Sequence, residues 1–301
     1  MEVNFSLATL IDVEIDERLV NGAVTPISSA EGEAIINRAP EPNDPPWRAW
    51  AAVGVWFASV LFILIVPTVV LLPYLATKEG VLSDPGVLAE FARTDAMAII
   101  LQIAAIIPAH ILTLLTAWVV VTQGKKFSFF KMLGWEKGDF AWWHYVLILI
   151  GFFALAAIVG NYFPEKENEL IRILQSSRSV VYLVAFVATF TAPLVEEVVY
   201  RGVLYSAFQR ALGIPAAFLL VTALFALVHI PQYYPSYSTI FLLTVLSLTL
   251  TAIRVRSRNL LPCVILHTLF NGIQSIFLIL RPEDAPPIIP EGASAIVHLF
   301  K

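Results

Sequence analysis

The stretch VVYLVAFVATFTAPLVEEVVY, residues 180–200, decides the fold class of this chain. About 20 predominantly apolar residues are enough for one helix to cross a bilayer, yet this stretch holds Glu196 and Glu197 side by side. On insertion scales, one acidic side chain at the middle of a membrane helix costs about 2.5–3.5 kcal/mol, so both carboxylates need partners. The candidate partners in the sequence are Arg201, His229 and His267. This set of ionisable residues in apolar surroundings is the main indication of function.

The composition is that of an integral membrane protein. Of the 301 residues, 58% are hydrophobic and only 14% are charged, whereas soluble domains are about 45–50% apolar and about 25% charged. A nucleic-acid-binding protein would need a basic face, which the sequence lacks. The single cysteine, Cys263, excludes an internal disulfide and any metal site built from several cysteines.

Long uncharged runs predict an all-α, polytopic membrane helix bundle with seven helices, or eight if a further span is formed. The predicted spans cover 47–75, 97–121, 140–162, a segment that begins at 179, 214–230, 237–253 and 260–280. Residues 47–280 therefore form the membrane domain. We expect 1–46 to be an acidic, largely disordered tail, because it ends in the proline-rich run RAPEPNDPPW. Residues 281–301 form a C-terminal tail.

The distribution of lysine and arginine predicts the orientation. Basic residues follow the second, fourth and sixth predicted helices, so they fall on one side if the helices alternate. They are Lys125, Lys126, Lys131 and Lys137, then Arg201 and Arg210, then Arg254, Arg256 and Arg258. Because loops rich in Lys and Arg stay cytoplasmic, we expect the N-terminus to lie in the cytoplasm.

Helix geometry gives the two glutamates different directions. Glu197 and Arg201 are four residues apart and share a helix face, which favours an ion pair. Glu196 is rotated by about 100° and is free to point elsewhere. Glu196 is therefore the candidate general base, with Glu197 as its arginine-held neighbour. The alternative is a purely structural ion pair that locks the helix into the bundle.

A hairpin gives Glu197 and its neighbour a histidine at the same depth. Gly213 is the predicted turn between the fourth and fifth helices, with Glu197 sixteen residues before it and His229 sixteen residues after it. At 1.5 Å per residue, both lie about 24 Å from the turn. In the last helix, His267 and Asn271 again share a face. Asn271 read alone fits simple interhelical hydrogen bonding.

These residue types suit amide hydrolysis in a water-accessible pocket. A glutamate beside a histidine can take a proton from water, and His and Asn side chains can donate hydrogen bonds to the resulting oxyanion. Two histidines and a carboxylate could instead hold Zn²⁺, which activates bound water. The residues permit both chemistries. His110 could line the same cavity, although a core or interface histidine is the simpler interpretation.

Three motifs resemble the signatures of the CPBP intramembrane proteases, also called the CAAX-processing or Abi family. They are EEVVYR at 196–201, FALVH at 225–229 and HTLFN at 267–271, with Gly202 after the arginine. They occur in the family's order, and the resemblance covers a protease-like core at about 180–280. It implies a membrane peptidase whose site opens to the cytoplasm.

The resemblance also implies roles for the site residues. Glu196 with His229 would activate water, Glu197 with Arg201 would support the site, and His267 with Asn271 would stabilise the oxyanion. No cofactor is required on this glutamate mechanism, and a zinc-dependent version would use Glu196, His229 and His267.

The implied partners are a membrane-associated peptide or protein substrate and the lipid bilayer, in what we expect to be a bacterial cell membrane. Some relatives are non-catalytic scaffolds or bacteriocin-immunity proteins, which is the alternative function.

Overall fold

The computed structural model describes residues 40–280, and every regular element in this range is helical. Seven stretches of the described chain are long and apolar enough to cross a membrane, which confirms the predicted polytopic bundle. The single-helix spans are α2 (Ala49–Leu75), α7 (Trp142–Tyr162), α12 (Ile214–Tyr233), α13 (Tyr237–Ser257) and α14 (Leu261–Leu280). The second span is α4 (Ala96–Ala104) followed by α5 (Ile106–Thr122).

The fourth span is the longest and contains two π-helical turns. It runs through α9 (Arg178–Phe186), η4 (Val187–Thr191), α10 (Ala192–Glu197), η5 (Val198–Leu204) and α11 (Tyr205–Leu212). Its 35 residues correspond to about 52 Å of helix, against about 30 Å of hydrocarbon in a typical bilayer. The span therefore extends beyond the apolar layer, which lets Arg210 lie outside it.

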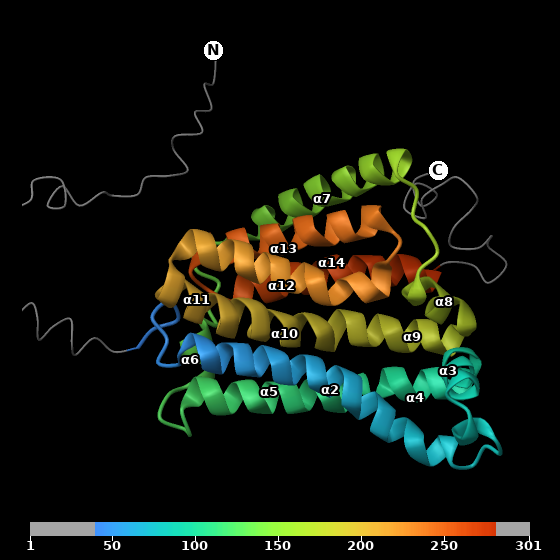
Figure 1. The fold of residues 1–301 in the computed structure, drawn as a ribbon. Helices are drawn as coiled ribbons and strands as arrows, with labels where there is room; N and C mark the ends of the chain where they lie inside the picture. The colour runs from blue at the N-terminus through green and yellow to red at the C-terminus, as the bar shows by residue number, and fades with distance from the viewer. Residues whose placement is uncertain (1–39, 281–301) are drawn as a thin grey trace, which may run out of the picture. The chain divides into compact units, whose positions relative to one another are not determined.

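The remaining described elements connect the spans. They are η3 (Val81–Ser83) and α3 (Pro85–Thr94) before α4, α6 (Phe129–Leu133) before α7, and α8 (Glu169–Ser176) before α9. Figure 1 shows the fourth span across the middle of the bundle, with α2, α4 and α5 on one side and α12, α13 and α14 on the other. The two faces of the fourth span are thus covered by different groups of helices.

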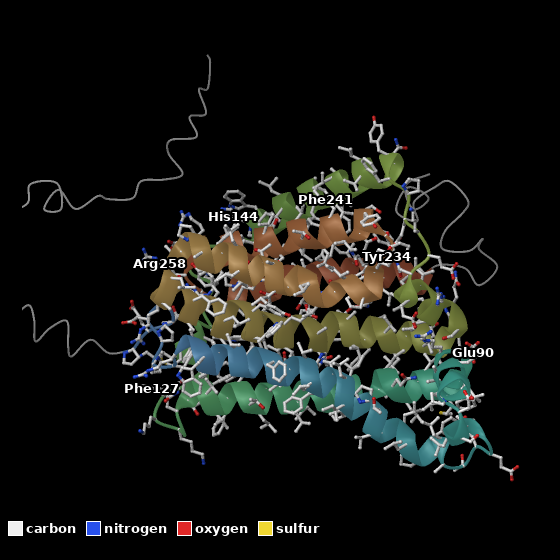
Figure 2. All side chains as sticks on the ribbon, viewed as in Figure 1. Glu90, Phe127, His144, Tyr234, Phe241 and Arg258 are labelled. Carbon is white, nitrogen blue, oxygen red and sulfur yellow. The ribbon has the colours of Figure 1, made fainter. Side chains whose placement is uncertain are left out.

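The two ends of the bundle differ in their charges. Figure 2 shows Phe127 and Arg258 toward one end, and Glu90 and Tyr234 toward the other. The first end holds the lysine-rich segment 123–141 and the arginines at the C-terminal end of α13, Arg254, Arg256 and the following Arg258. The second end holds the connections from α2 to α4 and from α7 to α9, where acidic and basic residues are mixed.

A close approach at Gly202 joins α6 and the residue just before α14 to the fourth span. A Cβ atom at Gly202 would lie 2.9 Å from the Cδ2 atom of Leu133 and 3.3 Å from that of Leu260. Both leucines are fully buried. Gly202 therefore allows these two side chains to pack directly on the π-helical turn η5.

Residues 40–46, which we assigned to the N-terminal tail, pack against the bundle instead. Asn43 Oδ1 accepts a hydrogen bond of 2.8 Å from Nη1 of the fully buried Arg254. The indole of Trp47 donates to the carbonyl oxygen of Val203 across 3.1 Å. Prolines prevent a helix here, but they leave carbonyl and amide oxygens free to meet a buried guanidinium. The rest of the expected tail, 1–39, and the tail 281–301 lie outside the described residues.

Candidate active site

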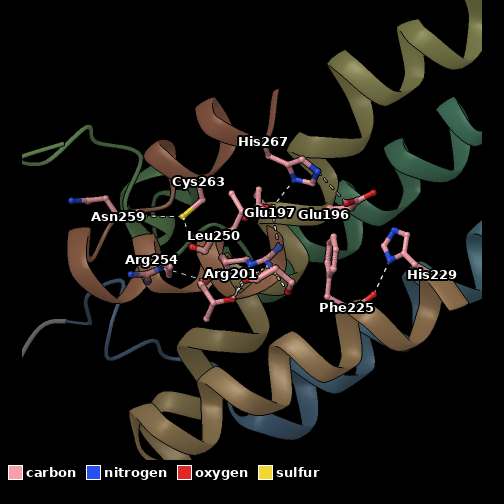
Figure 3. Close-up of polar contacts among 12 residues, drawn as sticks. Glu196, Glu197, Arg201, Phe225, His229, Leu250, Arg254, Asn259, Cys263 and His267 are labelled. Carbon is pink, nitrogen blue, oxygen red and sulfur yellow. Dashed lines mark hydrogen bonds and ion pairs between the residues drawn. The ribbon is translucent and has the colours of Figure 1, made fainter. Parts of the chain in front are cut away.

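Glu197 occupies the centre of the polar cluster. Its side chain is completely buried, and Oε1 accepts hydrogen bonds from Arg201 Nη1 at 2.9 Å and from His267 Nδ1 at 2.8 Å (Figure 3). The ion pair that the four-residue spacing predicts is therefore present. Oε2 of Glu197 is buried without a hydrogen-bond partner among the described residues.

Arg201 is held by two neighbouring helices. Its Nη2 atom donates to the carbonyl and hydroxyl oxygens of Ser247 in α13, at 3.0 and 2.8 Å. Its Nε atom lies 3.3 Å from Thr251 Oγ1, and its guanidinium stacks 4.8 Å from the ring centre of Phe225 in α12. A guanidinium bonded on several sides is fixed in direction, so Arg201 holds the Glu197 carboxylate in one orientation.

Glu196 points to a different part of the cluster, as helix geometry predicts. Its side chain is 24% exposed, whereas that of Glu197 is fully buried. Its Oε2 atom lies 3.8 Å from Nε2 of His267. His267 thus lies between the two glutamates, with one ring nitrogen toward each (Figure 3). Of the two carboxylates, Glu196 is the one that solvent or substrate can reach.

Hydrogen bonding determines where the protons of His267 lie. A carboxylate paired with an arginine accepts hydrogen bonds and donates none, so Nδ1 of His267 carries a proton toward Glu197. In the neutral ring, Nε2 is then an acceptor that faces Glu196. For Nε2 to donate a hydrogen bond to an oxyanion, the ring must carry both protons.

His229 is oriented by its own helix. Its Nδ1 atom donates to the carbonyl oxygen of Phe225, one turn earlier, across 2.7 Å, because a carbonyl can only accept. Its ring packs against those of Phe225 and Tyr233, with centroids 4.6 and 6.3 Å away. Among the described contacts, the ion-pair partner of Glu196 is His267 and not His229. Nε2 of neutral His229 is left as an acceptor.

One contact agrees with the expectation that the fourth and fifth spans pair as an antiparallel hairpin around Gly213. Arg201 and Phe225 lie twelve residues on either side of Gly213, and they stack at 4.8 Å. Two antiparallel helices paired at this level also bring the next turns, with Glu197 and His229, to similar depths. The sequence showed Phe225 only as the first residue of the FALVH motif and indicated no role for its ring. The structure places its ring against Arg201, His229 and His267.

Asn271 connects α14 to the π-helical turn η4. Its Nδ2 atom donates to the carbonyl oxygen of Ala188 across 2.8 Å. In a π turn this carbonyl would accept from residue 193, but Pro193 has no N–H, and the N–H of Ala192 bonds to Val187 instead. The amide of Asn271 therefore donates the hydrogen bond that Pro193 cannot donate. This contact fits the interhelical role that Asn271 also allowed.

His110 approaches the same region from α5. It is 7% exposed, and its Nδ1 atom lies 2.9 Å from Thr191 Oγ1 in η4. Pro108 accounts for the helix break just before His110. A proline clashes with the carbonyl four residues earlier, and the helix is interrupted at Ala105. The only sequence signal was a histidine close to a proline in an apolar helix.

The described residues do not form a metal site. No group of three His, Cys, Asp or Glu side chains between residues 40 and 280 is arranged to hold an ion. The zinc set Glu196, His229 and His267 is therefore not assembled as ligands. His229 Nδ1 is bonded to a backbone carbonyl and His267 Nδ1 to Glu197, so Nε2 is the nitrogen of each ring that could bind an ion.

One known protein family matches part of this chain. Residues 178–273 match the family described as type II CAAX prenyl endopeptidase Rce1-like. This part of the chain is similar to the CAAX protease family. The matched segment starts at α9 and ends within α14, so it includes both glutamates, Arg201, His229 and the last-helix pair, while α2 to α7 and His110 lie outside it. No curated protein and no solved structure matches the chain significantly.

Proposed function

We propose that this protein is an intramembrane endopeptidase that hydrolyses a peptide bond near the cytoplasmic face of the membrane, with water activated by Glu196. The observation that carries the proposal is that the two adjacent carboxylates differ in burial and in hydrogen bonding. Glu197 is buried and bonded to Arg201 and His267, while Glu196 is partly accessible. A structural ion pair needs the first carboxylate and gives no reason for the second.

The proposed reaction uses Glu196 as general base and then as general acid. Glu196 takes one proton from water, the water oxygen bonds to the carbonyl carbon, and the carbonyl electron pair moves onto its oxygen. When this intermediate collapses, the C–N bond breaks and Glu196 returns its proton to the leaving amine. His229, through its free Nε2, orients the attacking water.

His267, in its doubly protonated form, and Asn271 are the proposed donors to the oxyanion. The second N–H of the Asn271 amide serves this role, because the amide carries two protons and the described structure uses one for Ala188.

The family suggests the first substrate to test. Its description as a prenyl endopeptidase favours a farnesylated cysteine followed by three residues at the C-terminus of a membrane-associated peptide. The basic end of the bundle supports a cytoplasmic location for residues 123–141 and for the N-terminus. Peptides that are cleaved should therefore be those presented from that side.

Purified protein in detergent tests the proposal with a quenched-fluorescence peptide of this type and with an unprenylated membrane-peptide library. Glu196→Gln keeps the shape and removes the base, so cleavage should fall at least about 100-fold with unfolding unchanged. Equal cleavage by the variant would exclude Glu196 as the base. A wild type that cleaves neither probe, despite correct folding, would favour the non-catalytic scaffold. Activity that disappears on chelation and returns with zinc would favour the metal-dependent alternative.

A further inference from the structure

Arg254 is a buried cation whose hydrogen bonds go only to uncharged oxygens. It lies in the last turn of α13, and its side chain is fully buried. Its four acceptors among the described residues are the carbonyl oxygens of Arg201 and Pro42, the amide oxygen of Asn43 and the hydroxyl of Ser206. A buried charge that lacks a bonded carboxylate depends on such hydrogen bonds for compensation. Arg254 and these oxygens therefore constrain one another.

One of these bonds holds the backbone of the π-helical turn η5. Nε of Arg254 donates to the carbonyl oxygen of Arg201 across 3.2 Å (Figure 3). In an α-helix this carbonyl would accept from the N–H of Tyr205, but in η5 that N–H bonds to the carbonyl oxygen of Tyr200. Arg254 therefore donates to a carbonyl that the π turn separates from its α-helical partner.

The segment 42–47 binds the other end of the Arg254 guanidinium. Nη1 donates to Oδ1 of Asn43 at 2.8 Å, and Nη2 donates to the carbonyl oxygen of the preceding proline at 3.1 Å. The same segment also reaches η5 directly, because the indole of Trp47 donates to the carbonyl oxygen of Val203 at 3.1 Å. Two separate contacts thus connect η5 with a segment that lies outside the residues that match the family.

The side chain of Arg201 continues this chain of hydrogen bonds into the site. Its Nη1 atom donates to Oε1 of Glu197 at 2.9 Å, and the same oxygen accepts from Nδ1 of His267 at 2.8 Å. Four successive hydrogen bonds therefore lead from Asn43 to His267. A backbone shift at Arg201 would move the carboxylate that orients the His267 ring.

We propose that Arg254 is a positioning residue for the site, which holds the backbone of Arg201 and thereby the direction of the Glu197 carboxylate, and that the segment 42–47 holds Arg254 in place. The inference rests on the proposed function. It adds an arginine of α13 and a segment before α2 to a site whose motifs lie in α10, η5, α12 and α14. Their role is orientation, and no proton passes along these bonds.

Variants of Asn43 in the full-length protein test the proposal. The segment is varied rather than Arg254, whose removal would leave buried oxygens without a donor and destabilise the fold. Asn43→Ala removes the acceptor for Nη1 of Arg254, whereas Asn43→Asp keeps an oxygen atom in that place. We expect Asn43→Ala to lower kcat for the farnesylated peptide about 10- to 100-fold with KM unchanged, because a misplacement of about 1 Å can cost about 100-fold. Asn43→Asp should keep the kcat of the wild type. A wild-type kcat in Asn43→Ala, or equal losses in both variants, would overturn the proposal.

A second asparagine provides a control for stability. Asn168 is buried and caps α8, where its Oδ1 atom accepts from the N–H of Ile171 at 3.1 Å. Asn168→Ala therefore destabilises the protein without touching η5. Asp44→Ala changes the segment itself but removes only a half-exposed ion pair with Arg210. Both controls should keep the wild-type kcat below their melting temperatures. A loss in Asn168→Ala as large as that in Asn43→Ala would overturn the proposal.

Proton and nitrogen-15 spectra of histidine-labelled protein test the connection without substrate. The Nδ1–H signal of His267, identified by its absence in His267→Asn, should shift in Asn43→Ala and stay in place in Asn168→Ala. An unchanged signal in Asn43→Ala would overturn the proposal. If the signal shifts as expected but the wild type cleaves no probe, the proposed function fails while the positioning of Glu197 by Arg254 stands.

Discussion

His267 donates from Nδ1 to Oε1 of Glu197 across 2.8 Å. This bond joins the last described helix to the middle of the fourth span and fixes the ring so that its other nitrogen faces Glu196. A single imidazole thus serves two adjacent carboxylates that a helix would otherwise direct apart.

Exchanging His267 should separate the two uses of its ring. His267→Asn retains a donor near Nδ1 and removes the nitrogen that faces Glu196, so we expect normal stability and a loss of cleavage of at least about 100-fold. His267→Ala also leaves Glu197 without one buried partner, which should cost about 1–3 kcal/mol of stability. Cleavage assays and thermal unfolding in detergent measure both. Wild-type cleavage by His267→Asn would contradict a role for Nε2.

Gly202→Ala should destabilise the bundle. The added methyl group would meet buried Leu133 at 2.9 Å, and such overpacking typically costs about 1–3 kcal/mol. Gly151→Ala in α7 is the control, because a Cβ there meets nothing within 4 Å and alanine favours helix. Thermal unfolding of both variants measures the difference. Equal melting temperatures would show that the packing on η5 adapts freely.

The segment before α2 should contribute to stability through Asn43. Asn43→Ala removes the acceptor that faces Arg254 Nη1, and we expect a loss of about 1–3 kcal/mol because a buried cation loses a hydrogen bond. Asp44→Ala is the control, since its ion pair with Arg210 is half exposed and such pairs contribute at most about 1 kcal/mol. Denaturation in detergent should show that Asn43→Ala is less stable than Asp44→Ala.

Glu165 should make stability depend on pH. It lies in the connection between α7 and α8, and burial raises the pKa of its carboxyl group despite a hydrogen bond from Thr239. A raised pKa in the folded state means that the protein loses stability as the pH rises from the ordinary pKa of glutamate through the folded value. Glu165→Gln removes this loss and keeps an acceptor for Thr239.

The measurement for Glu165 is the difference in unfolding free energy between Glu165→Gln and the wild type. It should grow in favour of the variant as the pH rises from the ordinary pKa of glutamate, about 4.3, through the raised pKa of the folded state. A difference that shrinks over this range would mean that the carboxylate is stabilised rather than penalised by its surroundings.

The sequence predicted those parts of the molecule that depend on local spacing. Hydropathy runs predicted the seven spans, and the four-residue interval predicted the contact between Glu197 and Arg201. The contact from His267 to Glu197 could not be predicted in the same way, because it depends on how α14 packs against α10. The order of the segment 40–46 depends on Arg254, which is buried by helices far along the chain.

The π-helical turns limit what length the fourth span can have. Each one accommodates a residue more than an α-helical turn would, so deleting one residue between 187 and 191 would return that turn to α-helix. A deletion in the regular α-helical part of the span, where no extra residue is absorbed, would instead rotate the chain before it by about 100° relative to Glu196. Asn271 holds Ala188 on one side of this turn, and His267 meets the glutamates on the other. The span should therefore accept many substitutions between these anchors, but outside the π-helical turns no insertion or deletion.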